Sequence, residues 1–153
     1  MAIIKQDYGE IGGGDSYPLA CYIHNYSSYY STSAPQGTLI WTLQKSGAAA
    51  NEWLTQSSSG WIKYKLDSNE AKKVKKVRFM NLVQNASQTS RSVAIYGSND
   101  DSTYTPLGTF TPDASQGSIN EFNLSNNTNY LYYRVDVTGV SSFVGFGAIQ
   151  FYE

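Results

Sequence analysis

One segment near the N-terminus concentrates the groups that recognise sugars. It reads Tyr22-Ile23-His24-Asn25-Tyr26-Ser27-Ser28-Tyr29-Tyr30. Aromatic faces stack on the apolar C–H patches of a pyranose ring, and imidazole, amide and guanidinium groups bond its hydroxyls. As a strand, the segment would place Tyr22, His24 and Tyr26 on one face, because side chains alternate across a strand. The alternative is that these tyrosines only cover a sheet surface.

The sequence gives little support for a set of catalytic residues. A serine triad needs a histidine base held by a carboxylate, and His24 is the single histidine, flanked by Ile23 and Asn25 with no nucleophile-elbow motif in the chain. A glycosidase needs two carboxylates across a cleft, and with 12 acidic residues the sequence cannot test that pairing. We therefore expect a protein that is not an enzyme.

Cysteine and histidine usage limits metal sites and cofactors. The single Cys21 excludes a disulfide within the chain, and together with the single His24 it excludes the common cysteine and histidine zinc sites. We expect Cys21 to act as a small buried hydrophobe. No metal site and no cofactor is expected.

Composition and charge exclude two classes of partner. The 153 residues include 11 Lys and Arg against 12 Asp and Glu, a net charge of −1, whereas duplex nucleic-acid binders carry a basic excess. The basic run at 72–76 is interpreted as a solvated strand entry. No apolar run approaches the ~18 residues of a membrane span. We expect neither a nucleic-acid partner nor membrane insertion.

Period-two alternation of apolar and polar residues recurs after Pro18 and predicts short strands. Ile62, Tyr64 and Leu66 share one face, and Lys63 and Lys65 share the other. Similar alternation appears at 76–81, 92–96, 121–124, 131–137 and 149–152, with polar turn clusters between the runs. Many short strands joined by polar turns predict an all-β jelly-roll β-sandwich over residues 18–153.

The opening residues 1–17 have a different character. Gly9 and the run Gly12-Gly13-Gly14 disfavour regular structure, so we expect a flexible glycine-rich arm. The apolar start Ala2-Ile3-Ile4 is shorter than the h-region of a signal peptide. We therefore expect synthesis in the cytoplasm, and an extracellular or virion-associated place of work reached without a signal peptide.

The order of motifs after residue 52 resembles the discoidin domain, also called the coagulation-factor C-type domain, and the related galactose-binding-like carbohydrate-binding modules. The matching stretches are Trp53, Gly60-Trp61-Ile62-Lys63-Tyr64-Lys65-Leu66, Val93-Ala94-Ile95-Tyr96-Gly97-Ser98-Asn99-Asp100-Asp101, Tyr132-Tyr133-Arg134-Val135 and Gly147-Ala148-Ile149-Gln150-Phe151-Tyr152. The resemblance implies a galactose-binding-like jelly roll that binds glycans, lipid headgroups or proteins through loops at one end. Within this pattern we expect Trp53 and Trp61 to pack in the core or beneath the loops.

Two departures limit what the resemblance implies. Family members often hold a structural calcium ion with a loop before the first Trp and a Glu in the last strand, where this chain has Ala48-Ala49-Ala50-Asn51 and Ala148. Calcium prefers six or more oxygens, several of them carboxylate, so we expect no such site. Galactose-binding members place an Arg just after the 77–79 strand, and here none occurs before Arg91.

The sequence therefore favours a non-catalytic carbohydrate-binding module that recognises a glycan of a bacterial surface. Its candidate ligand-binding residues are His24, Asn25, Tyr26, Tyr29, Tyr30, Asn81, Asn85 and Arg91. The alternative is a structural adaptor of a phage-like particle, which contacts other particle proteins or itself and has no sugar site. That alternative draws on the opening residues 1–14, which resemble the starts of small prophage structural proteins.

Overall fold

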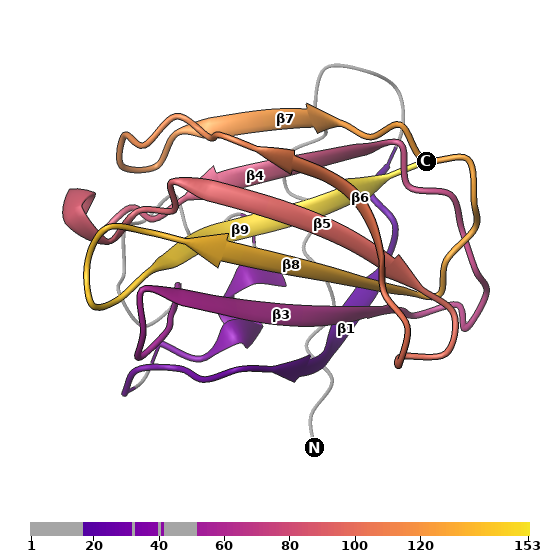
Figure 1. The fold of residues 1–153 in the computed structure, drawn as a ribbon, viewed down its shortest axis with the longest axis horizontal. Coiled ribbons are helices and arrows are strands. Elements are labelled where there is room, and N and C mark those ends of the chain that lie inside the picture. The colour runs from indigo at the N-terminus through magenta and orange to yellow at the C-terminus, as the bar shows by residue number, and fades with distance from the viewer. Residues whose placement is uncertain (1–16, 32, 40, 42–51) are drawn as a thin grey trace.

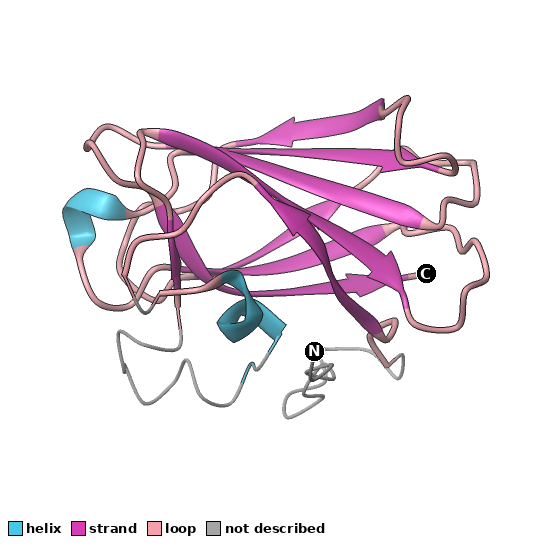
Figure 2. Ribbon diagram, turned by 90° about the horizontal axis from the view of Figure 1, so that it is seen from below, coloured by secondary structure: helices cyan, strands magenta, loops and turns pink. Residues whose placement is uncertain are grey.

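Two antiparallel β-sheets face each other in the molecule (Figure 2). The structure is a computed structural model that describes residues 17–31, 33–39, 41 and 52–153. The all-β sandwich predicted from the strand pattern is confirmed. Of the expected arm, all but Tyr17 lies outside the described residues, and Tyr17 itself is 67% exposed. No helix in the described part of the chain is long and apolar enough to cross a membrane.

The first sheet has five strands in the order β1-β3-β8-β5-β6 (Figure 1). They are β1 (Cys21–Tyr26), β3 (Ser59–Leu66), β8 (Tyr132–Thr138), β5 (Ser92–Ser98) and β6 (Thr105–Phe110). Of these, β6 carries Pro106 and Gly108 and shows little alternation. Its position at the edge of the sheet explains how it accommodates a proline, which cannot donate to a ladder on both sides.

The second sheet has four strands in the order β2-β9-β4-β7. They are β2 (Trp53–Leu54), β9 (Gly145–Tyr152), β4 (Lys76–Asn81) and β7 (Ile119–Asn123). Two short 3-10 helices, η1 (Pro35–Leu39) and η3 (Ala86–Gln88), lie outside the sheets.

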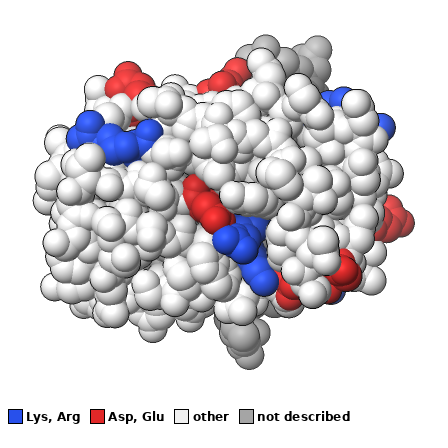
Figure 3. Space-filling view, in the orientation of Figure 1, with Lys and Arg blue, Asp and Glu red and all other residues white. Residues whose placement is uncertain are grey.

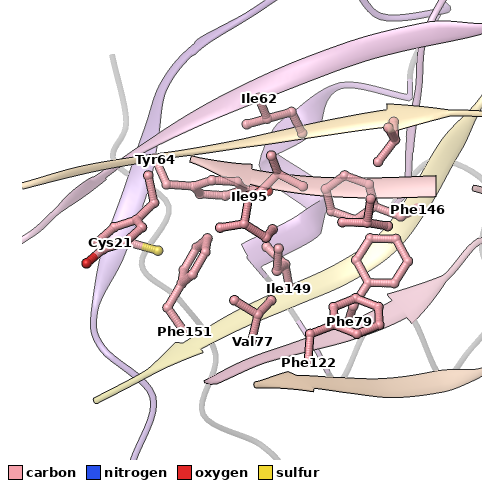
Figure 4. Packing of buried hydrophobic residues seen from close by; sticks show 14 of the residues in the cluster. Cys21, Ile62, Tyr64, Val77, Phe79, Ile95, Phe122, Phe146, Ile149 and Phe151 are labelled. Atoms are coloured by element: carbon pink, nitrogen blue, oxygen red, sulfur yellow. The ribbon is translucent and has the colours of Figure 1, made fainter. Parts of the chain in front are cut away.

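The core fills the space between the inner faces of the sheets, and aromatic rings dominate it (Figure 4). The Tyr64 ring meets Phe151 edge-on at 5.3 Å, and the Phe79 ring lies 4.9 Å from Phe146. Both Trp53 and Cys21 belong to this core, as the sequence predicts, and burial raises the pKa of the Cys21 thiol. On the side of the five-stranded sheet, the core is lined by the buried residues of β3, β5 and β8, which alternate with more exposed ones along each strand.

Strand β9 departs from the alternation that its sequence predicts, because all eight of its residues are buried. Its inner residues join the core. On its outer side Ala148 packs in a second small cluster with Trp41 and Met80, and η1 packs against the strand. Gln150 and Tyr152, which alternation places in solvent, are buried as well. The covering residues come from a distant part of the chain, so the local pattern could not reveal them.

The strand directions sort the loops into two groups at opposite ends of the sandwich (Figure 1). The segments that follow β1, β2, β4, β6 and β8 gather at one end, which we call the Tyr30 end. The segments that follow β3, β5 and β7 gather at the other, together with the C-terminal Glu153. A binding site needs side chains from several loops, and the Tyr30 end gathers more segments than the other end. It is therefore the stronger candidate for a binding site.

Candidate functional site

A hollow of about 240 Å³ opens at the Tyr30 end, and we call it the end hollow. Leu54 and the buried Leu82 give it apolar walls. Polar side chains and one aromatic ring also line it: Tyr30, Ser31, Ser33, Glu52, Gln84 and Gln88. An aromatic ring beside amide and hydroxyl groups is the combination that sugar recognition requires.

Backbone hydrogen bonds fix the aromatic side of the hollow. The Tyr30 N–H donates to the Leu54 carbonyl at 2.7 Å, and the Ser33 N–H donates back to the Tyr30 carbonyl at 2.9 Å. The indole N–H of Trp53 reaches the Ser28 carbonyl at 2.8 Å. The segment after β1 is thus tied to β2, and the Tyr30 ring is held at the rim while 47% of the residue stays exposed. Phe143 supports that ring at 5.1 Å.

Glu52 fixes the opposite side of the hollow. The residue is buried, and its carboxylate accepts hydrogen bonds from the backbone N–H groups of Val83 and Gln84. Burial raises the pKa of this carboxyl, and the two backbone hydrogen bonds offset part of that rise. Glu52 therefore positions the loop that carries Gln84 and Gln88. Among the described residues that line the hollow it is the only acid, whereas glycoside hydrolysis uses a pair.

The predicted tyrosines separate into two kinds. Tyr29 and Tyr30 are 39% and 47% exposed at the Tyr30 end. Tyr26 is half-buried, packs against the core and meets the Tyr29 ring edge-on at 5.7 Å. Tyr30 lines the end hollow and Tyr29 is exposed beside it, whereas Tyr26 lies between the core and the Tyr29 ring.

Two further predicted residues, Asn85 and Arg91, belong to the loop between β4 and β5. Asn85 is exposed and caps η3, because its side-chain oxygen accepts the Ser87 N–H at 3.0 Å. Arg91 is exposed at the entry to β5, where its backbone N–H donates to the Thr138 carbonyl. Both lie at the Tyr30 end, and neither lines the end hollow.

Asn81 is a correction to the predicted site. It is fully buried, and its amide nitrogen donates to the carbonyls of Ser90 and Asp113 at 3.0 Å each. Its amide oxygen accepts the N–H groups of Leu82 and Ser90. With both donors and its acceptor oxygen engaged, Asn81 holds two loops together and offers nothing to a ligand.

His24 and Asn25 also lie away from the end hollow. The register of β1 against β3 shifts between Ile23 and Asn25, and His24 sits in that irregularity. Its ring contacts Asp101 and Tyr132, which belong to the other end and to the outer face of the five-stranded sheet. The Asn25 side chain is exposed and accepts the N–H of Tyr26. The expectation that the His24 region converges with the other loops is therefore wrong for His24 itself.

Sequence reasoning missed Glu52, Gln84 and Gln88 as lining residues. The family pattern marks the stretch after Phe79 as a ligand-binding position. It does not single out Gln84 or Gln88, because glutamines in a loop carry no periodic signal. Glu52 stands directly before the core residue Trp53, and only its hydrogen bonds to a loop 31 residues away reveal its role.

Of the two positions considered for calcium, the stretch 48–51 lies outside the described residues. Ala148 is fully buried in β9 and supplies no ligand side chain. The described residues contain no group of three or more His, Cys, Asp or Glu side chains arranged to hold a metal ion.

Comparison with known proteins gives a result at the level of the fold. No protein-family model and no curated protein sequence matches the chain. Among solved structures, a family 32 module of Clostridium perfringens in complex with GalNAc-β-1,3-galactose superposes with a TM-score of 0.66 at 13% identity, over 84% of this chain and 93% of that one. The fold is that of the family 32 carbohydrate-binding modules.

Two further family 32 modules agree with this assignment. The module of Streptococcus pneumoniae EndoD has a TM-score of 0.67 at 10% identity and covers 87% of this chain and 95% of its own. The module of AlyQ, in complex with 4,5-unsaturated mannuronic acid, has a TM-score of 0.64 at 16% identity over 96% of both chains. The resemblance drawn from the motifs is thus confirmed for the fold, and the particle association and the place of work remain predictions.

Proposed function

We propose that the chain is a non-catalytic carbohydrate-binding module and that the end hollow holds the sugar. The observation that carries the proposal is the pairing of an exposed, backbone-anchored Tyr30 ring with the polar groups of Gln84, Gln88 and Ser31 around one hollow. The C. perfringens module with the same fold is described with a galactose-containing disaccharide. Structural likeness and hollow chemistry support the same class of ligand.

The hollow is small, about 240 Å³, and this sets the expected affinity. Few atoms of a sugar would leave water, so we expect a dissociation constant on the order of 0.1–1 mM, about 4–5 kcal/mol. Such affinity serves a module that is displayed in several copies or joined to another domain, because linked sites gain avidity without new contacts.

A glycan array probed with multivalent protein tests the proposal. We expect the wild type to bind at least one glycan and the Tyr30→Ala variant to lose at least about tenfold in signal, since the stacking ring is removed. Tyr17→Ala is the matched control, because Tyr17 is 67% exposed and precedes Leu19, which bonds Phe151 near the opposite end. Failure to bind any glycan, or full binding by Tyr30→Ala, contradicts the proposal.

A further inference from the structure

The outer face of the five-stranded sheet carries an aromatic and charged surface that the end hollow does not use. Alternation places Trp61, Tyr96 and Tyr132 on this face, opposite the buried Ile62, Ile95 and Tyr133. Trp61 is half-buried here, which corrects the expectation that it packs in the core or beneath a loop. In Figure 3 acidic and basic side chains adjoin in the middle of this face, over β8 and β3.

Arg134 organises the centre of the face. Its guanidinium forms a two-pronged ion pair with Asp136 at 2.6 and 2.7 Å. The same guanidinium lies 5.5 Å from the centre of the Trp61 ring and 5.4 Å from that of Tyr96. Lys63 contributes a second cation, 5.4 Å from the Trp61 ring. Such contacts hold Trp61 and Asp136 in fixed positions before any ligand arrives.

A groove of about 260 Å³ adjoins Trp61 and Asp136 on this face, and we call it the face groove. Three hydroxyl-bearing residues, a glycine and a valine complete its lining: Ser27, Ser59, Thr138, Gly60 and Val137. Gly60 allows close packing beneath the groove, because a Cβ atom there would lie 2.5 Å from a methyl group of Thr55, 3.0 Å from the Ser27 hydroxyl oxygen and 3.1 Å from the Trp53 ring. The groove thus combines an indole, a carboxylate and three hydroxyl groups.

The face groove and the end hollow lie on the two sides of one chain segment. Ser27 lines the face groove, whereas Tyr30 and Ser31 line the end hollow, and the two sets of lining residues share no member. Ser27 is itself held in place, since its N–H donates to the Trp61 carbonyl at 3.0 Å and its hydroxyl oxygen accepts the Trp61 N–H at 3.0 Å. The groove is therefore a separate, prearranged feature.

We propose that the face groove is a second sugar-binding site, independent of the end hollow, that holds one residue of a neutral glycan. Trp61 offers the apolar surface, and Asp136 accepts hydrogen bonds from sugar hydroxyls. Each oxygen of Asp136 accepts one bond from Arg134 and retains a lone pair for a ligand. An acidic sugar would meet this carboxylate as a like charge, while the nearby cations Arg134 and Lys63 already have acidic partners.

Titration of the isotope-labelled protein with galactose, cellohexaose and xylohexaose, followed by amide NMR spectra, tests this site. We expect at least one of these neutral probes to shift the Trp61 indole signal and the backbone signals of Ser59 and Thr138. The indoles of Trp41 and Trp53 are 1% and 0% exposed and serve as internal references. The side-chain amides of Gln84 and Gln88 report on the end hollow in the same spectra.

A pair of matched variants makes the assignment specific. Thr138→Arg introduces a long side chain into the groove from an exposed strand position and should weaken the Trp61 response at least tenfold. Thr109→Arg is the control, because Thr109 is exposed on β6 of the same sheet and lies outside the groove lining. The spectra themselves show whether each variant is folded.

The outcomes separate this inference from the proposed function. Shifts at Gln84 and Gln88 alone overturn the second site and support sugar binding in the end hollow. Shifts at Trp61 alone support the face groove and contradict sugar binding in the end hollow. If no neutral probe moves the Trp61 signal, or an oligomannuronate moves it more strongly than the neutral probes, the face groove is not a neutral-sugar site.

Discussion

At the scale of single residues, Asp101 links three side chains of the outer sheet face. Its carboxylate contacts His24 at 2.8 Å and Lys63 at 3.1 Å, and it accepts the Tyr104 hydroxyl. Burial raises the pKa of Asp101, but the hydrogen bonds from Tyr104, His24 and Lys63 outweigh it and lower the pKa to about 2. The neighbouring Asp100 instead caps the turn by accepting the N–H groups of Ser102 and Thr103.

Asp101→Asn is expected to lower the free energy of unfolding at pH 7 by about 1–2 kcal/mol, since hydrogen bonds to a charged group are lost. A depressed folded-state pKa gives stability that is present above the unfolded value near 3.8 and disappears as pH falls toward about 2. Urea unfolding at pH 7 and pH 2 measures both effects. Asn also tolerates the positive φ of 57° at this position.

The control for this prediction is Glu121→Gln, which removes an exposed ion pair with Lys76 at 3.7 Å. Exposed pairs contribute little, so its cost should stay below about 1 kcal/mol at any pH. A wild-type advantage over Asp101→Asn that persists unchanged at pH 2 would show that the carboxylate charge is not the cause.

At the scale of elements, Asn81 joins the loop between β4 and β5 to the loop between β6 and β7 through four buried hydrogen bonds. Asn81→Ala leaves several buried backbone groups without partners and should cost at least about 3 kcal/mol. Thermal or urea unfolding measures the loss. Asn85→Ala removes only the exposed cap of η3 and should cost about 1 kcal/mol or less. Equal costs for the two variants would refute this division of roles.

The local pattern predicts the inner faces of the strands well, because burial on one side imposes period two on the sequence. It predicts neither the outer burial of β9 nor the position of His24. The first depends on Trp41 and η1, which come from a distant part of the chain and pack against this sheet. The second depends on a register shift in β1 that no residue type signals. The sequence singles out Tyr29 and Tyr30, which the structure shows to be exposed, and their role in binding stays a prediction. The hydrogen bonds between Glu52 and the loop at 83–84 depend on the three-dimensional fold and have no signal in the sequence.

At the scale of the whole molecule, stability is expected to be independent of calcium. The described residues hold no cluster suited to a metal, and Ala148 stands where related domains are expected to place a carboxylate. A ligand that binds the native state raises the melting temperature by mass action. Adding EDTA should therefore leave the melting temperature unchanged. A clear drop that calcium reverses would reveal a site built from other oxygens.

The two proposed sites would place binding on the loops and on the outer face of one sandwich. Neither site requires the inner core to move, so variants at the exposed tyrosines should separate binding from stability. Tyr26 is the internal contrast, because it packs against the core and its truncation should lower the free energy of unfolding by several kcal/mol.

The most direct measurement is therefore calorimetric titration with a glycan selected on the array, paired with unfolding of the same samples, for Tyr26→Ala, Tyr29→Ala and Tyr30→Ala. Because Tyr30 is 47% exposed and lines the end hollow, Tyr30→Ala should weaken binding at the end hollow at least about tenfold, at a stability cost of about 1 kcal/mol. Tyr26→Ala should chiefly destabilise the fold. If all three variants bind the glycan as the wild type does, the end hollow is not where the sugar binds.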